Sequence, residues 1–540
     1  MRRLLAPALV VATLWVFAPV RHHGFLDYDD RTYVTERPEV RAGLGASGVA
    51  WAFTNVAAGN WHPVTWLSHM LDEDLFGLDP GPQHLVNVAL HALSAVLLFS
   101  GLARATGAPG RAAFAAAVFA LHPQRVESVA WIAERKDVLS GVFFFAALCA
   151  YGRWTAAPSA ARGAALLALA LLGLLSKSML MTLPIVLLLV DLWPLGRLRT
   201  TADLPARLRE KAPLIALCGA IGAIALFAQW RGGSLTTLEV LPPQDRVANA
   251  LVSPVLYLRD FLWPTQLAVL YPHPRGGWGW WQPLGAAALL CAITLACLRA
   301  VRTRPVFLAG WLWFLVMLLP VIGLVQVGAQ ARADRYTYLP MVGPVVAMTW
   351  GIADANAFRR IATALPVAAL AALLALAAAT RAQLAWWRDD ATLFARAAAV
   401  TRDNAIAYSN WANALDADPV EQRALLERAL AIEPRLASAH YGLGRALERD
   451  GDPEGAEREY RLALRSDPNH ASAHNNLGNL LLASGRIDEA ILHYRVALAR
   501  EPGRASTSHN LAVALREQAE AMAREPRGAA PPSEAPEPRQ

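Results

Sequence analysis

Three acidic residues fall within four positions after the first apolar run of the chain. They are Asp27, Asp29 and Asp30, in the stretch GFLDYDDRTYVTERP that begins at Gly24. A carboxylate beside a membrane can accept a proton from a hydroxyl group, or it can coordinate a divalent cation. Acidic pairs are also common in solvated loops. The pair alone therefore leaves three interpretations open: a general base, a metal site or a solvated loop.

Two later polar segments and one isolated lysine supply cations. LHPQRVESVAWIAERKDVLS begins at Leu121, QARADRYTYLPMVG begins at Gln330, and Lys177 stands inside an apolar region. A phosphate group has acceptor oxygens that fit an arginine fork, although charge pairing and snorkelling at helix ends are the competing explanation. The candidate phosphate-binding residues are Arg335, Arg125, Arg135, Lys136, Lys177 and Tyr336.

Histidines and tryptophans crowd the same polar segments. His62 and His69 are seven residues apart, as are His84 and His91, but no HExxH-like ligand motif occurs. We therefore expect hydrogen-bonded histidines and no metal site. The tryptophans of the first loop, Trp51, Trp61 and Trp66, suggest interfacial amphipathic helices with the tryptophans as a belt at the membrane surface.

The elements that must position these residues are apolar runs near the length of a membrane helix. The chain of 540 residues is 55% hydrophobic and 17% charged, against about 25% charged in soluble domains. The sequence predicts about 11 transmembrane helices. They lie near 4–20, 86–103, 112–121, 137–152, 163–180, 179–195, 212–230, 283–298, 305–325, 337–353 and 361–380.

The charges of the connecting loops predict an orientation. Every second loop is short, rich in arginine and poor in acids, whereas the others, near 21–85, 122–136, 231–282 and 326–336, are longer and mixed. The positive-inside rule then places the N-terminus in the cytoplasm. An odd number of spans places the C-terminal module outside, in the periplasm of a Gram-negative cell. We interpret the net charge of +7 as a consequence of these arginine-rich cytoplasmic loops, and we expect no nucleic-acid partner.

The C-terminal part repeats every 34 residues, as the spacing of Pro434, Pro468 and Pro502 shows. This is the period of tetratricopeptide (TPR) helix pairs, which bind protein or peptide but can also act as a spacer. The predicted fold class is all-α, with a polytopic membrane domain followed by a TPR α-solenoid. The predicted domains are 1–380 (membrane domain), 381–401 (connecting helix), 402–524 (about three repeats and a cap) and 525–540 (disordered tail).

The combination resembles a known family. The phrases YDDRTYVTERPEVRAG, GNWHPVTWLSHMLD, FALHPQRVESVAWIAERKDVLS and RYTYLP, with about eleven spans and a trailing TPR array, are similar to the transmembrane-and-TPR-containing O-mannosyltransferases. The chain looks like a bacterial relative of these enzymes, which belong to the GT-C class of membrane glycosyltransferases.

The resemblance implies a function and assigns roles. It implies that a sugar, mannose or another hexose, passes from a polyprenyl-phosphate donor to a hydroxyl acceptor such as Ser or Thr of an exported protein, with inversion. It places the catalytic role on Asp29 and Asp30 and leaves Asp27 outside the pair. It assigns binding of the donor phosphate to the cationic residues, with Arg335 as the first candidate. His62, His122 and Glu127 are weaker candidates for acceptor or sugar contacts, and no metal or cofactor is implied.

Three alternatives remain, of which the first is a transporter, although a transporter is expected to show internal repeats among its spans. An O-antigen ligase or polymerase is also a multispan enzyme, although its long loop and main arginines are expected late in the membrane domain. A non-enzymatic envelope scaffold would use the spans only as an anchor for the TPR array. We expect a multi-pass protein of the bacterial inner membrane, with the TPR array in the periplasm on the same side as the acidic pair.

Overall fold

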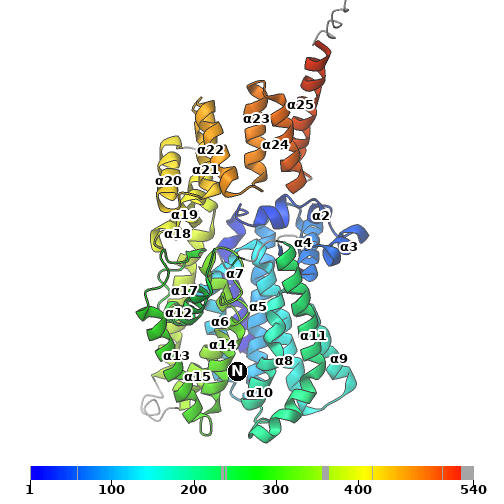
Figure 1. Cartoon of the computed structure of the whole chain (residues 1–540). Coiled ribbons are helices and arrows are strands. Elements are labelled where there is room, and N and C mark those ends of the chain that lie inside the picture. The colour runs from blue at the N-terminus through cyan, green and yellow to red at the C-terminus, as the bar shows by residue number, and fades with distance from the viewer. Residues whose placement is uncertain are drawn as a thin grey trace, which may run out of the picture. The chain divides into compact units, whose positions relative to one another are not determined.

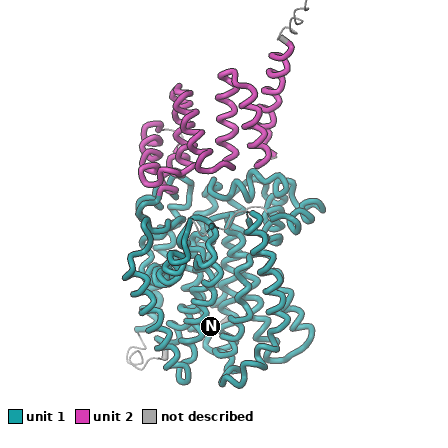
Figure 2. Tube along the Cα trace, viewed as in Figure 1, with its two compact units in different colours: residues 1–404 teal, residues 405–540 magenta. Residues whose placement is uncertain are grey.

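The computed structural model describes residues 2–56, 59–232, 236–237, 240–354, 364–415, 418–501 and 503–524. The chain divides into two compact units, residues 1–404 and 405–540 (Figure 2). The predicted disordered tail, 525–540, and the first residues of the predicted span 361–380 lie outside the described residues.

The described residues of the first unit are mainly helical. Its elements are α1 (Arg2–Phe17), α2 (Pro38–Arg41), α3 (Ala46–Thr54), α4 (Pro63–Phe76), α5 (Pro80–Thr106), α6 (Pro109–Leu121), α7 (Val126–Ala130), α8 (Arg135–Ala156), α9 (Ala160–Ser176), α10 (Leu183–Leu192), α11 (Leu204–Arg231), α12 (Pro243–Leu262), β1 (Tyr271–Pro272), α13 (Trp281–Ala300), α14 (Pro305–Leu318), β2 (Gln330–Arg332), α15 (Val342–Asp354), α17 (Leu365–Leu384) and α18 (Asp390–Val400).

In the part of the chain that the structure describes, each predicted apolar run lies largely on a helix. In the described part of the chain, six helical segments are long and apolar enough to cross a membrane: 4–22, 80–106, 132–156, 201–231, 281–300 and 365–387. The other predicted runs fall on shorter apolar helices, at 109–121, 160–176, 178–192, 305–318 and 342–353. The all-α fold class with a polytopic membrane domain is thus confirmed, with the spans of unequal length.

Local sequence explains the helix boundaries that position the polar segments. Proline stands in the first turn of α4, α5, α6 and α14, where its missing N–H is not needed. Gly107 ends α5 with a φ of 67°, a left-handed conformation that suits glycine. Between α9 and the turn that precedes α10, Lys177 has extended backbone, with φ −156° and ψ 126°. This break carries the lysine side chain out of the helical path.

The polar segments gather at one end of the bundle. α3 and α4 lie at that end, and α10 lies at the other (Figure 1). The long segment 231–282, predicted as a loop, also contains the helix α12 and the strand β1, which pairs antiparallel with β2 through Tyr271 and Arg332. Asn249 of α12 donates to the carbonyl oxygen of Ala331 at 2.7 Å. These contacts hold the segment before Arg335 in place.

The second unit consists of helix pairs, confirming the TPR prediction. The helices are α19 (Ala405–Ala414), α20 (Pro419–Ile432), α21 (Ala437–Arg449), α22 (Pro453–Ser466), α23 (Ala471–Ala483), α24 (Ile487–Arg500) and α25 (Ala505–Arg524). Glycine is required where the paired helices meet. A Cβ at Gly444 would lie 2.6 Å from the ring of Tyr460, and one at Gly478 would lie 2.7 Å from the ring of Tyr494.

Candidate active site

The two aspartates of the first loop have different environments. Asp30 is fully buried, and both of its carboxylate oxygens accept backbone hydrogen bonds. Oδ2 accepts from the N–H of Leu26 and Oδ1 from the N–H of Ala133, each at 2.8 Å. Burial raises the pKa of Asp30 to about 7, although the two N–H donors oppose the rise. Asp30 therefore fastens the first loop to the segment before α8, and its complete burial keeps it from contact with a substrate.

Asp29 is half-buried and lies among charged side chains. The charges that act on its carboxylate are those of Lys136, Glu134 and Arg335. Within the described residues, no group donates a hydrogen bond to the Asp29 carboxylate. Burial raises the pKa of Asp29 above its ordinary value, and the charge of Lys136 opposes that rise. An ionised carboxylate with free acceptor capacity and a raised pKa suits proton abstraction.

Three cations converge on the buried carboxylate of Glu134. Its oxygens lie 3.1 Å from Nζ of Lys136, 3.6 Å from Nζ of Lys177 and 3.3 Å from Nε of Arg335. The Glu134 side chain is only 2% exposed, whereas the three cationic side chains are 12–15% exposed. The cations therefore stand on the accessible side of the cluster, with the acid behind them. We call these four residues with Asp29 the Glu134 cluster.

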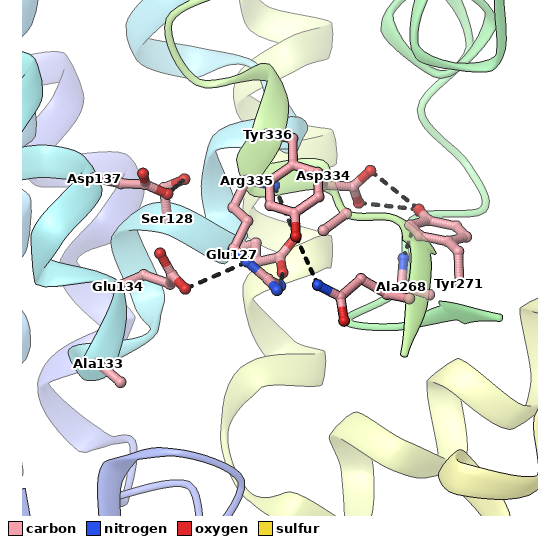
Figure 3. A network of polar contacts seen from close by, with 12 residues as sticks. Glu127, Ser128, Ala133, Glu134, Asp137, Ala268, Tyr271, Asp334, Arg335 and Tyr336 are labelled. Atoms are coloured by element: carbon pink, nitrogen blue, oxygen red, sulfur yellow. Dashed lines mark hydrogen bonds and ion pairs between the residues drawn. The ribbon is translucent and has the colours of Figure 1, made fainter. Parts of the chain in front are cut away.

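Arg335 is fixed by a second buried acid. Glu127 accepts from the backbone N–H of Arg335 at 2.9 Å and also forms an ion pair with the guanidinium (Figure 3). The guanidinium lies 5.5 Å from the ring centre of Trp131 and 5.1 Å from that of Tyr336. Gln330 in turn donates to the hydroxyl of Tyr336 at 2.6 Å. The arginine is oriented by an acid and two aromatic rings, and it keeps unused N–H donors.

Lys177 reaches the cluster because of the break after α9. Its Nζ forms ion pairs with Asp137 and Glu134. Ser128 holds the other oxygen of Asp137 through a 2.9 Å hydrogen bond. Helix α8 thus supplies Lys136 and Asp137 from its first turn, and the neighbouring break supplies the third cation.

Aromatic rings border the cluster. Tyr28, directly before Asp29, stacks on Trp131 with ring centres 5.5 Å apart. Tyr33 stacks on Trp66 at 4.9 Å and on His62 at 5.5 Å, and Lys136 lies 4.6 Å above the Tyr33 ring. The expected surface-belt role of Trp66 is wrong, because Trp66 is fully buried under this stack.

His62 lies beside the cluster as a neutral side chain. It is almost fully buried, and its Nε2 has no hydrogen-bond partner among the described residues. Burial lowers the pKa of His62 to about 3, with the charge of Lys136 adding to the effect. A neutral imidazole with an unused nitrogen could still hydrogen-bond a ligand hydroxyl.

Three predicted residues have other partners. Arg135 is fully buried among Asp72, Ser68, Asn87 and the carbonyl of Gln83. Arg125 is buried, donates to the carbonyl oxygen of Thr337 at 2.7 Å and packs on Phe119. His122 accepts from the N–H of Gln124 and binds the carbonyl oxygen of Phe261 through Nε2. All three join segments of the chain together and do not face the Glu134 cluster.

The predicted set lacked several residues that the structure places at the cluster. These are Glu134, Asp137, Tyr28, Tyr33 and Trp131. For Glu134 and Asp137, the signal available in the sequence was the mixture of acids and cations in ERKD (134–137), which indicates ion pairing. Within the described residues, no group of three or more His, Cys, Asp or Glu side chains has the arrangement of metal ligands.

Comparisons with known proteins cover both units. The Tetratricopeptide repeat family matches residues 423–469 and 441–505. The human protein O-mannosyl-transferase TMTC1 is 26% identical over 484 residues, 78% of this chain and 54% of the relative. The mouse protein O-mannosyl-transferase TMTC4 is 26% identical over 466 residues, 76% of this chain and 58% of the relative. The Xenopus laevis tmtc2 is 43% identical over 94 residues, 17% of this chain and 11% of the relative.

The apolar bundle and the repeats define a multi-helix membrane protein with a TPR array. More particularly, the chain is a relative of the TMTC protein O-mannosyl-transferases, as its sequence motifs predicted. In the two long alignments the chain spans just over half the length of these relatives.

Proposed function

We propose that the chain is a membrane glycosyltransferase that moves a sugar from a polyprenyl-phosphate donor to a hydroxyl group. The relatives are named as protein O-mannosyl-transferases, which supports sugar transfer to a polypeptide. The observation that carries the proposal is the Glu134 cluster, in which the charges of Lys136 and Arg335 act on the Asp29 carboxylate. Both of these cations are partly exposed, and Lys177 is a third partly exposed cation paired with Glu134. A proton acceptor beside phosphate-binding groups is what such a transfer needs.

Asp29 is the proposed general base. The acceptor hydroxyl gives its proton to the Asp29 carboxylate while its oxygen bonds to the anomeric carbon of the sugar. The bond from that carbon to the donor phosphate oxygen breaks, and its electron pair leaves with the lipid phosphate. One displacement inverts the anomeric carbon. Asp30 is a positioning residue, because both of its oxygens already accept backbone hydrogen bonds.

The cations stabilise the leaving phosphate. Arg335 is the first candidate because Glu127 and two aromatic rings fix its orientation while part of the side chain is exposed. Lys136 and Lys177 add positive charge. Their ammonium groups can exchange part of their interaction with Glu134 for an interaction with the phosphate as the phosphate leaves. Preoriented donors of this kind stabilise charge that develops in the transition state. Arg125 and Arg135 act indirectly, by holding the segments that carry the cluster.

The second unit is proposed to bind the polypeptide acceptor. TPR arrays offer a concave surface for peptide, and they carry out no chemistry themselves. For this role the repeats and Asp29 must lie on the same side of a bacterial plasma membrane, the extracytoplasmic side. The arginine-rich loops on the other side support that orientation.

The test is sugar transfer in membranes that contain the full chain. A panel of polyprenyl-phosphate sugars, including mannose, is offered with a Ser/Thr peptide acceptor, and Asp29→Asn is compared with Asp27→Asn. Asp27 is the matched control because it is a nearby aspartate whose side chain is 72% exposed. Its ion pair with Arg31, at 3.9 Å, is also on the exposed surface. We expect Asp29→Asn to lower transfer by about 10²–10⁴-fold and Asp27→Asn to leave it unchanged. Full transfer by a folded Asp29→Asn variant would refute the proposal.

A further inference from the structure

A large cavity lies in the first unit at the other end of the bundle from the Glu134 cluster. Its volume is about 680 Å³, and it is lined by α5, α8, α10, α14, α15 and residues 193–197. Along α5, the side chain of Asn87 donates to the carbonyl of Trp131 beside the cluster, whereas Gly101 lines the cavity. These two residues are separated by roughly 21 Å of helix at 1.5 Å per residue. The cavity is therefore a separate site.

The lining of the cavity is mostly apolar. It includes Leu98, Leu102, Phe145, Leu148 and Val346. The cavity is partly open to the outside, and its apolar surface is more stable when other apolar groups cover it. In a bilayer, the natural filling for such a space between helices is hydrocarbon. The cavity has a volume typical of small-ligand sites.

Glycine residues form part of two walls of the cavity. On one side, α14 and α15 are in backbone contact at Gly310 and Gly343, where an added Cβ on either glycine would overlap the carbonyl oxygen of the other. These helices cannot move closer together. On the other side, Gly152 lines the cavity, and a Cβ added there would meet no atom within 4 Å. The space at Gly152 is thus free for a ligand.

The cavity has unpaired positive charge at its rim. Arg104 and Arg153 both line it and are exposed, and no carboxylate in the described part of the chain forms an ion pair with either. The third lining arginine, Arg197, differs because it is paired with Asp191 at 2.8 Å and Glu210 at 2.9 Å. An apolar space with two free guanidinium groups at its edge is complementary to a lipid that has an anionic headgroup.

We propose that this cavity binds an anionic glycerophospholipid, with an acyl chain in the apolar space and its phosphate on Arg104 and Arg153. The lipid comes from the leaflet on the arginine-rich side. The proposal does not depend on the sugar-transfer reaction, because none of these residues belongs to the Glu134 cluster.

The test measures lipid binding to the purified, delipidated full chain by native mass spectrometry. The probes are phosphatidylglycerol, phosphatidylcholine and polyprenyl phosphate, added separately and in competition. We expect one phosphatidylglycerol to bind at least about tenfold more tightly than phosphatidylcholine, a difference of about 1.4 kcal/mol. Arg104→Gln with Arg153→Gln removes this preference, and Gly152→Leu blocks the binding of phosphatidylglycerol.

Matched variants separate these effects from loss of folding or of overall charge. Arg299→Gln with Arg302→Gln removes two other arginines that do not line the cavity, and Gly110→Leu adds the same side chain at another glycine with free space. Both should bind phosphatidylglycerol as the wild type does. Equal binding of the two phospholipids, an unchanged Arg104/Arg153 variant, or displacement of phosphatidylglycerol by equimolar polyprenyl phosphate would overturn the proposal.

Discussion

At the scale of single residues, burial and hydrogen bonding give identical side chains different roles. Asp29 and Asp30 are adjacent carboxylic acids, yet one is open to a ligand and the other is enclosed by backbone donors. The same division applies to the cations. Arg335 and Arg135 both contact carboxylates, but Arg335 is 12% exposed and Arg135 is fully buried. Only the exposed member of each set can touch a substrate.

Asp30→Asn should loosen the first loop, whereas Asp29→Asn should not. The amide keeps one acceptor but turns its NH₂ toward a backbone N–H, and leaving a buried donor unpaired costs about 1–3 kcal/mol. Hydrogen exchange of peptides that contain Leu26 and Ala133, followed by mass spectrometry in the full chain, measures this opening. Equal protection in both variants would contradict the clamp role of Asp30.

The pH dependence of transfer should follow the charge near Asp29. Asp29 must be ionised to accept a proton, so transfer falls as pH drops through its pKa. Burial raises that pKa and Lys136 lowers it. Lys136→Met removes the lowering charge, so the acidic limb of kcat/KM should move to higher pH.

Lys177→Met is the control for this shift, because Lys177 pairs with Glu134 and Asp137 and is not among the charges that act on Asp29. Its acidic limb should stay in place even if the rate falls. An acidic limb that stays fixed, or moves to lower pH, in Lys136→Met would exclude Asp29 as the titrating base.

The sequence could indicate that an aspartate and an arginine are suited to the proposed sugar transfer. It could not indicate which aspartate or which arginine is accessible to a substrate. The family resemblance left two of the three acids, Asp29 and Asp30, as candidates for the catalytic base. The burial and backbone hydrogen bonds of Asp30 then distinguish it from Asp29. The decisive partner of Asp30 is the N–H of Ala133, 103 positions away, and a backbone donor leaves no mark in sequence. Arg125, Arg135 and Arg335 are the same residue type, so the sequence could not tell them apart. Only tertiary packing shows that Arg125 binds a carbonyl oxygen and that Arg135 binds a buried acid.

At the scale of elements, close helix contacts set the frame of the bundle. α14 and α15 meet through Gly310 and Gly343, where backbone touches backbone. Gly310→Ala or Gly343→Ala should each lower the free energy of unfolding by about 1–3 kcal/mol, because overpacking forces the helices apart. Thermal unfolding in detergent measures the loss as a lower Tm.

Gly285→Ala is the matched substitution on α13, where a Cβ would meet no atom within 4 Å. It should keep or raise the Tm, since alanine is the better helix former. If all three substitutions shift the Tm alike, close packing is not what requires glycine at 310 and 343.

Periodicity and turn residues predicted most elements correctly, and the 34-residue repeat predicted the helix pairs of the second unit. The break at Lys177 was also visible, in the polar residues and proline of SKSMLMTLP. The helix α12 was missed because it is strongly amphipathic and contains Pro254. Its buried polar residues, such as Asn249 and Asp260, bind the segment before Arg335 and do not produce an apolar run.

At the scale of the whole molecule, the proposed roles of Asp29 and of the repeats require both to lie on the same side of the membrane. Reporter enzymes fused after Thr106 and after Arg524 should be active in the cytoplasm and outside it, respectively. The reason is the alternation of arginine-rich and mixed loops along the chain. A reporter after Arg524 that is active in the cytoplasm would remove the repeats from the side of Asp29 and contradict their role as an acceptor platform.

The most direct measurement for the central claim is chemical rescue of Asp29→Ala. With the carboxylate removed, transfer should fall about 10²–10⁴-fold, and added formate should restore part of it by acting as the missing base. Asp27→Ala should transfer sugar normally and gain nothing from formate. Unimpaired transfer by folded Asp29→Ala, or formate rescue of Glu127→Ala in place of Asp29→Ala, would contradict the assignment of Asp29 as the general base.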